Sequence, residues 1–243
     1  MSNRRALLFK EEGGGFTSLG LILQVKTDNT GTSDDDQFTI PRFGGGFNYA
    51  VETSDGQSFS GQTSNLTITF PSAGTYDIAI TGDFPRIFFN GVGDRLKLVD
   101  IKQWGNIAWG ITMQSAFEGC LLTNVTATDA PNFSAVTTMQ EMFSGCGLMT
   151  FIDVSNWSST SSVTSFARMF RFCSNLDTSF AGFDLSSSNG GGTDFIQLGG
   201  ISTANYDATL IAWEAQAPAI NQTWGMGTSI YTEGGAAETA RTS

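Results

Sequence analysis

A repeat of about 26 residues is the feature that most constrains how this chain can fold. It occurs three times, with offsets of 26 and 27 residues, and its matched positions are Met113, Phe117 and Cys120, then Met139, Phe143 and Cys146, then Phe166, Phe170 and Cys173. One such unit cannot bury its own phenylalanine, so neighbouring units must stack. The repeat predicts a solenoid with these nine residues in its core. We expect Phe143 to lie in the central coil and Phe170, nearer the last coil, to contribute less stability.

The residues between the copies point to a known repeat class. Residues 142–146 read MFSGC, residues 152–157 read IDVSNW, and Val163 and Thr164 follow. Over about residues 94–202 the chain resembles the BspA-like leucine-rich repeat, a 26-residue class of bacterial surface proteins. The resemblance implies a cell-surface or secreted adhesion protein. The same repeat class also occurs in phage and environmental surface proteins.

A helix is predicted directly after the repeats. Tyr206, Leu210 and Trp213 have the i, i+4, i+7 spacing of an apolar helix face, and Thr203 or Asn205 can serve as the N-cap. The exposed end of a solenoid needs a cap, and this helix can provide it.

Before the repeats, apolar residues alternate with polar ones in five short segments, LILQV, FTI, FNYAV, LTITF and YDIAI. Alternation of this kind predicts strands with one face on a core, and several short strands predict a β-sandwich. Asp55-Gly56 and Gly74-Thr75-Tyr76 are similar to the turn and the strand start of the polycystic-kidney-disease (PKD) type of immunoglobulin-like module. Thr53 and Ser54 stand where that family has Trp-Gly.

The sequence therefore predicts a mainly β protein in four parts. These are a flexible basic arm (1–15), an Ig/PKD-like β-sandwich (16–90), a short leucine-rich-repeat-like solenoid (91–200), and a capping helix with a C-terminal tail (201–243).

Composition excludes several functions. The chain has no histidine, which removes the Ser-His-Asp triad, the Cys-His pair and histidine metal sites. A net charge of −11 argues against nucleic acid as a partner. No apolar run reaches the ~18 residues that a membrane helix needs, so membrane insertion is not expected. We expect no cofactor, no metal site and no catalytic residue.

Two residue types have both a structural and a chemical interpretation. The three cysteines lack a CxxC pair and are expected to be buried thiols. The acidic segment 28–36 lacks the position-twelve Glu of a calcium loop and is expected to be a solvated hairpin turn. Asp100, Asp129, Asp153 and Asp184 leave a carboxylate-based polysaccharide-degrading enzyme as a third hypothesis, although capping of backbone turns is favoured.

Among the five tryptophans, Trp104 and Trp157 are expected in the ladder core. Trp109 and Trp224, each followed by glycine, are the candidates for ligand-facing rings.

The N-terminal arm is the predicted attachment site. Arg4 and Arg5 can bind carboxylates, and Leu7, Leu8 and Phe9 offer a small apolar anchor. The expected partners are other virion proteins of the capsid or tail, or sister subunits in a homo-oligomer. A host-surface glycan or protein is a further candidate.

No secretory signal is evident at residues 1–15, and a phage virion component needs none because lysis releases it. The favoured hypothesis is a non-enzymatic virion-surface protein, such as a capsid decoration protein, a head fibre or a tail fibre. The alternative is an adhesin on the bacterial cell surface or outside the cell that binds host glycoprotein or polysaccharide.

Overall fold

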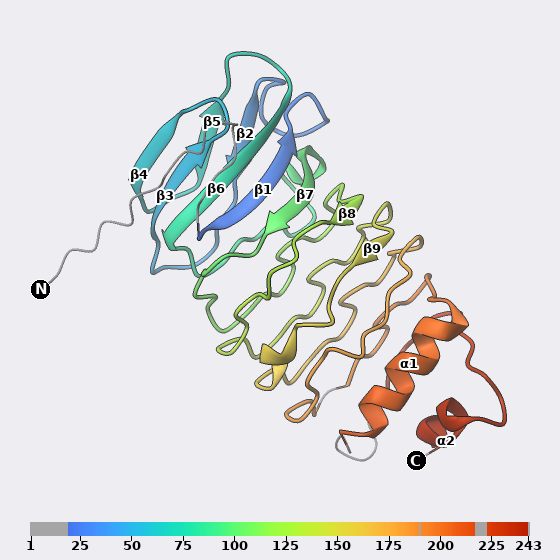
Figure 1. Cartoon of the computed structure of the whole chain (residues 1–243). Helices are drawn as coiled ribbons and strands as arrows, with labels where there is room; N and C mark the ends of the chain where they lie inside the picture. The colour runs from blue at the N-terminus through green and yellow to red at the C-terminus, as the bar shows by residue number, and fades with distance from the viewer. Residues whose placement is uncertain (1–18, 190, 217–222, 243) are drawn as a thin grey trace, which may run out of the picture.

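The computed structural model describes residues 19–189, 191–216 and 223–242, and the chain is mainly β, as predicted (Figure 1). Strands form two sheets toward the N-terminal end. A stack of short coils follows, and α1 (Thr203–Glu214) and α2 (Ala236–Thr242) lie beyond it. Most of the buried apolar residues of the sheets, the coils and α1, from Leu21 to Met226, belong to one hydrophobic cluster.

Five strands form an antiparallel sheet in the order β4-β3-β6-β1-β7. Their bounds are β1 (Leu21–Lys26), β3 (Asn48–Thr53), β4 (Ser58–Gln62), β6 (Thr75–Asp83) and β7 (Leu98–Gln103). In the β1–β6 pair, Leu21 lies opposite Ile80 and Leu23 lies opposite Ile78, and all four side chains are buried. The predicted alternation thus provides the apolar face of this sheet.

A second sheet has two antiparallel strands, β2 (Gln37–Ile40) and β5 (Leu66–Thr69). Phe38 and Ile68 lie opposite one another in this pair, and both are fully buried. They belong to the same hydrophobic cluster as the buried residues of β1 and β6, so the two sheets share one core.

The five-stranded sheet continues past residue 90, where the sequence predicted the sandwich to end. Its edge strand β7 pairs with β1 through Leu23 opposite Ile101 and Val25 opposite Leu98. On its other side β7 accepts a backbone hydrogen bond from Ala127 to Ile101, 3.0 Å long. One strand therefore belongs both to the sheet and to the first coil.

Successive coils are joined by backbone hydrogen bonds that recur at the repeat spacing. Phe117 donates to Met142 (2.8 Å), Phe143 to Met169 (2.9 Å), and Phe170 to Phe195 (2.8 Å). Opposite this ladder, β8 (Asn124–Val125) and β9 (Phe151–Ile152) pair in parallel. The 3-10 turns η1 (Arg95–Lys97) and η2 (Ser158–Thr160) also lie in this region. We call residues 89–189, 191–200 and 223–229, which are linked in this way, the coil stack.

The coil stack has a fourth copy of the repeat turn, at residues 191–199, and does not end at residue 200. Gly192 donates to Thr223 (3.2 Å), and Ile196 donates to Gly225 (2.8 Å), so a further segment of chain pairs with the fourth copy. The sequence predicted only three copies because the fourth has glycine where the others have methionine or phenylalanine and cysteine.

Helix α1 covers the coil at Phe180. The Trp213 indole N–H donates to the Phe180 carbonyl at 2.9 Å, while Tyr206 and Leu210 are half-buried. The N-cap is Ser202, not Thr203 or Asn205. Part of the predicted polar tail folds as α2, which contacts α1.

Candidate binding surface

The nine residues of the predicted repeat core are all buried, at most 2% exposed. The rings of Phe117 and Phe143 stack with centroids 5.3 Å apart and an 11° angle between planes. Phe143 and Phe170 continue the stack at 5.5 Å and 4°. These residues build the scaffold and present nothing to solvent.

The three cysteines are free and buried. The Cys146 thiol donates to the Phe117 carbonyl and the Cys173 thiol donates to the Phe143 carbonyl, each at 3.2 Å. Burial raises the pKa of Cys120 and Cys146 well above the ordinary value, and it raises that of Cys173 to about 12. Thiols in this state are poor nucleophiles. No group of three or more ligating side chains suitable for a metal ion occurs within residues 19–189, 191–216 and 223–242.

The two tryptophans proposed as ligand-facing differ in their exposure. Trp109 is 3% exposed and belongs to the core. Trp224 is half-buried and contacts the Trp213 ring at 4.3 Å and the Phe195 ring at 5.3 Å. The prediction is wrong for Trp109, which packs in the core. Trp224 packs one part of its ring against the fourth repeat copy and remains partly exposed. Trp104 and Trp157 are core residues, as predicted.

The four carboxylates considered for catalysis are engaged by backbone N–H groups. Asp153 and Asp184 each accept a hydrogen bond of 2.9 Å from the residue two positions later. Asp100 and Asp129 accept bonds of 2.9 Å and of 2.7–2.9 Å from backbone N–H groups about one repeat away. The hydrogen bonds from Ser155 hold the pKa of Asp153 below its ordinary value. These carboxylates fasten turns and coils.

The acidic loop at residues 28–36 is held by a buried lysine. Lys97 is fully buried, and its ammonium group lies within hydrogen-bond distance of the carbonyls of Ser33 (3.0 Å), Asp34 (2.7 Å) and Gln37 (3.0 Å) and of the Ser33 hydroxyl (3.0 Å). The buried Lys97 therefore holds the backbone of the loop that was predicted to be a solvated turn.

Asp94, three residues before Lys97 in the chain, binds backbone N–H groups of the same loop and of β2. Its carboxylate accepts hydrogen bonds from the backbone N–H groups of Thr32 (2.8 Å), Ser33 (3.0 Å) and Thr39 (2.7 Å). Burial on its own would raise the pKa of Asp94, but the hydrogen bonds from Ser33, Thr39 and Thr32 outweigh it and lower the pKa. The two charged residues form a structural clamp.

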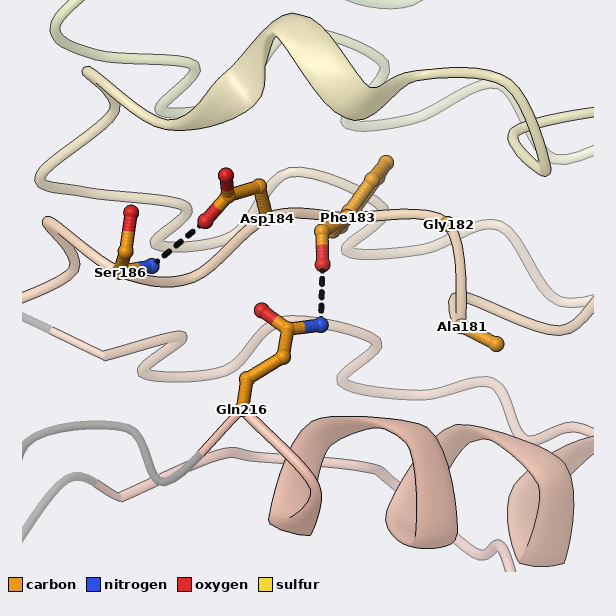
Figure 2. A pocket seen from close by; sticks show the side chains of 6 residues that line it. All are labelled: Ala181, Gly182, Phe183, Asp184, Ser186 and Gln216. Carbon is orange, nitrogen blue, oxygen red and sulfur yellow. Dashed lines mark hydrogen bonds between the residues drawn. The ribbon is translucent and has the colours of Figure 1, made fainter.

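A shallow pocket of about 450 Å³ lies between the coil at residues 181–186 and the end of α1 (Figure 2). Gln216 spans it: its amide donates to the Phe183 carbonyl at 2.8 Å and accepts from the Leu185 N–H at 2.8 Å. Asp184 faces Ser186 in the same view. Figure 2 shows the Gln216 amide bonded to the Phe183 carbonyl and one Asp184 oxygen bonded to the Ser186 N–H, so these polar groups are already occupied within the pocket.

One flank of the coil stack exposes large apolar side chains at a strained position. At this repeat position the earlier copies have Gly119 and Gly145, with φ of 70° and 78°. The later copies have Phe172 and Leu198, with φ of 62° and 60°, and these side chains are 39% and 68% exposed. Phe172 donates a backbone hydrogen bond to the Gln197 carbonyl at 2.8 Å. Because Leu198 directly follows Gln197, this bond places Phe172 and Leu198 next to one another on adjacent coils. We call Phe172 and Leu198 the apolar edge.

A second exposed group lies where the sheets meet the coil stack. The Arg86 guanidinium carbon lies 4.3 Å from the Phe88 ring centroid and 5.3 Å from that of Phe43. Phe43 is 58% exposed. We call Phe43, Arg86 and Phe88 the arginine–aromatic cluster.

Both exposed groups were missed from the sequence. An alignment of the repeat copies that includes the turn after Phe170 puts Phe172 in the place of a glycine, and this signal was available. The cluster carries no such signal, because Phe43 and Arg86 are brought together only by folding. The predicted attachment residues Arg4, Arg5, Leu7, Leu8 and Phe9 lie outside the described residues.

The described helices include none that is long and apolar enough to cross a membrane. Residues 111–197, less than half of the chain, match a family described as "Mycoplasma protein of unknown function, DUF285". This span includes Phe117, Phe143 and Phe170 of the ladder. No curated protein and no solved structure matches the chain. What the chain is similar to is thus a family without a stated activity, and the similarity is confined to the repeat region.

Proposed function

We propose that this chain is a non-enzymatic, virion-associated surface-binding protein of a phage, acting as a capsid decoration protein, a head fibre or a tail fibre. In this proposal the two sheets form an Ig/PKD-like sandwich, and the coil stack is a leucine-rich-repeat-like solenoid that presents an adhesion surface. The N-terminal region attaches the chain to other virion proteins or to sister subunits.

The apolar edge is the observation that carries the binding role. A left-handed backbone conformation costs a non-glycine residue about 1–2 kcal/mol, and glycine avoids this cost. Phe172 and Leu198 bear it although they leave much of their apolar surface in water. Folding alone therefore favours glycine at Leu198. At Phe172 the ring has one contact of its own, with the Arg171 guanidinium 4.3 Å from its centroid. A partner that covers the edge explains why large apolar side chains stand there.

The state of the polar groups supports a binding role over catalysis. The repeat carboxylates accept hydrogen bonds from backbone N–H groups, and the thiols are buried with raised pKa values. A glycoside hydrolase would instead need two carboxyl groups free to face a sugar.

The resemblance of the repeat to a bacterial surface class that also occurs in phage proteins supports a location on a particle. The test is mass spectrometry of particles purified from lysates of the source culture on a density gradient. We expect the chain in the particle fraction at a fixed ratio to the major capsid protein. Recovery in the cell-envelope fraction alone would overturn the virion assignment and establish the bacterial adhesin alternative.

The apolar edge is tested by the double variant Phe172→Gly/Leu198→Gly, with Ile230→Ala as the control at another exposed apolar residue. The double variant should fold with a free energy of unfolding within about 1 kcal/mol of the parent, because glycine relieves the strained φ. Particles carrying it should adsorb to host cells about tenfold less than the parent, and the control should adsorb normally. Unchanged adsorption of the double variant would remove the edge from the binding surface.

A further inference from the structure

The arginine–aromatic cluster has a geometry fixed by backbone pairing. Arg42 and Ile87 form an antiparallel bridge, and Phe88 donates to the Pro41 carbonyl at 3.3 Å. This pairing sets Phe43 beside Arg86 as cross-strand neighbours. The rings of Phe43 and Phe88 also contact one another, with centroids 5.0 Å apart. The guanidinium lies over two touching rings.

Within the part of the chain that the structure describes, Arg86 forms no ion pair. The chain has 23 acidic residues and a net charge of −11, yet no carboxylate within the described part of the chain forms an ion pair with Arg86. One terminal nitrogen donates to the Gln114 carbonyl at 3.1 Å, and the buried Nε has no hydrogen-bond partner among the described residues. Burial lowers the pKa of Arg86 because the charged form is partly desolvated.

An anion can bind the terminal nitrogens of this guanidinium, because the Nε itself is buried and out of the reach of a ligand. The neighbouring ring indicates what the anion is attached to. A guanidinium binds a carboxylate through two parallel N–H donors. The 58% exposed ring of Phe43 offers a flat apolar surface of the size of one pyranose face. Three side chains span the area of a single residue of ligand, far below the roughly 800 Å² per partner of a stable protein interface.

We propose that Phe43, Arg86 and Phe88 form a subsite for a carboxylate-bearing sugar of an acidic polysaccharide, in which Arg86 binds the carboxylate and Phe43 stacks on the sugar ring. This rests on the proposed adhesive function and names its ligand class. One subsite binds weakly, and many copies on a particle add their contributions.

The test is a titration of the full chain with trigalacturonate and, separately, with its methyl ester. The ¹H–¹⁵N NMR signals of the arginine side chains are recorded at each step of the titration. We expect the acid to shift the Arg86 Nε–H signal and to bind about tenfold more tightly than the ester, which has the same shape without the charge. Arg86→Gln should abolish this preference, and Phe43→Ala should weaken both ligands by about the same factor. Arg241→Gln is the matched control, because its guanidinium lies over Tyr231 at 5.3 Å in a different part of the molecule.

Equal binding of acid and ester would overturn the subsite, and so would an Arg86→Gln variant that keeps the preference. If Arg86→Gln fails to fold, Phe43→Ala decides, because Phe43 is an exposed ring: parent-like binding of trigalacturonate by that variant would overturn the stacking role. A hexaglutamate peptide that binds as tightly as trigalacturonate would overturn the sugar assignment. None of these results bears on whether the chain occurs in virions, so a failure of the subsite is distinguishable from a failure of the proposed function.

Discussion

Phe143 and Phe170 lie almost parallel, with ring centroids 5.5 Å apart and planes inclined by 4°, although 27 residues separate them in the chain. Phe143 also stacks on Phe117, and Phe170 also contacts Phe180 and Phe195, at 5.1 Å and 5.5 Å. Each ring is thus packed on two sides, and neither stands at the end of the ladder.

Phe143→Ala and Phe170→Ala should therefore destabilise the protein to a similar degree, by ~3–5 kcal/mol each, because each leaves a cavity inside the stack. This differs from the expectation from sequence, which assigned Phe170 the smaller cost. Denaturant unfolding of both variants measures the difference. A parent-like unfolding midpoint for Phe143→Ala would contradict a stabilising role of the stacked phenylalanine rings.

Lys97→Met should destabilise the protein by ~2–4 kcal/mol, because it leaves the carbonyls of Ser33, Asp34 and Gln37 without their shared donor. Lys102→Met is the matched control. Lys102 lies on the surface with an ion pair to Asp77, which contributes less than about 1 kcal/mol. Thermal unfolding of both variants is the measurement, and equal losses would show that the internal cation does not anchor the acidic loop.

The clamp also predicts a dependence of stability on acidity. The pKa of Asp94 is lower in the folded protein than its ordinary value of 3.8, because the hydrogen bonds from Ser33, Thr39 and Thr32 overcome the effect of burial. Its contribution to the free energy of unfolding is therefore full above pH 3.8 and is lost as the pH falls through the lower folded value. Asp94→Asn should flatten this part of the stability profile between pH 5 and pH 2, as measured by urea unfolding. A slope as steep as that of the parent would assign the acid sensitivity to other carboxylates.

The cysteines should react with a thiol reagent only after the protein unfolds. All three are at most 2% exposed, and burial raises each thiol pKa, which removes the thiolate that reacts. Labelling with Ellman's reagent at pH 8, with and without denaturant, checks this. Fast labelling of the native protein would contradict the inward placement of Cys120, Cys146 and Cys173.

The repeat was readable from the sequence because its signal is local and recurs. Phe and Cys at a fixed spacing placed nine side chains in the core, and the alternating segments predicted most of the strands. The fourth copy escaped because Gly192 and Gly199 stand where the earlier copies have Phe166 and Cys173. Stacking still holds it, since the backbone ladder needs no particular side chain.

The surface features depend on contacts between distant residues and could not be predicted in the same way. Lys97 and Ser33 are 64 residues apart, and Arg86 and Phe43 are 43 apart, so neither pair leaves a pattern in a sequence window. Trp109 and Trp224 were assigned to the surface because glycine follows each. For Trp109 that local cue was overridden by packing in the core, whereas Trp224 remains partly exposed.

Strand β7 has a mechanical consequence. It is hydrogen-bonded to β1 on one side and to the first coil on the other, so no linker separates the sheets from the coil stack. A force applied to the sheets is transmitted to the coils through the hydrogen-bonded backbone of β7. If the sheet end is tethered to a particle, the coil stack cannot swivel on its base, and the direction in which its flank faces outward is set when the chain folds.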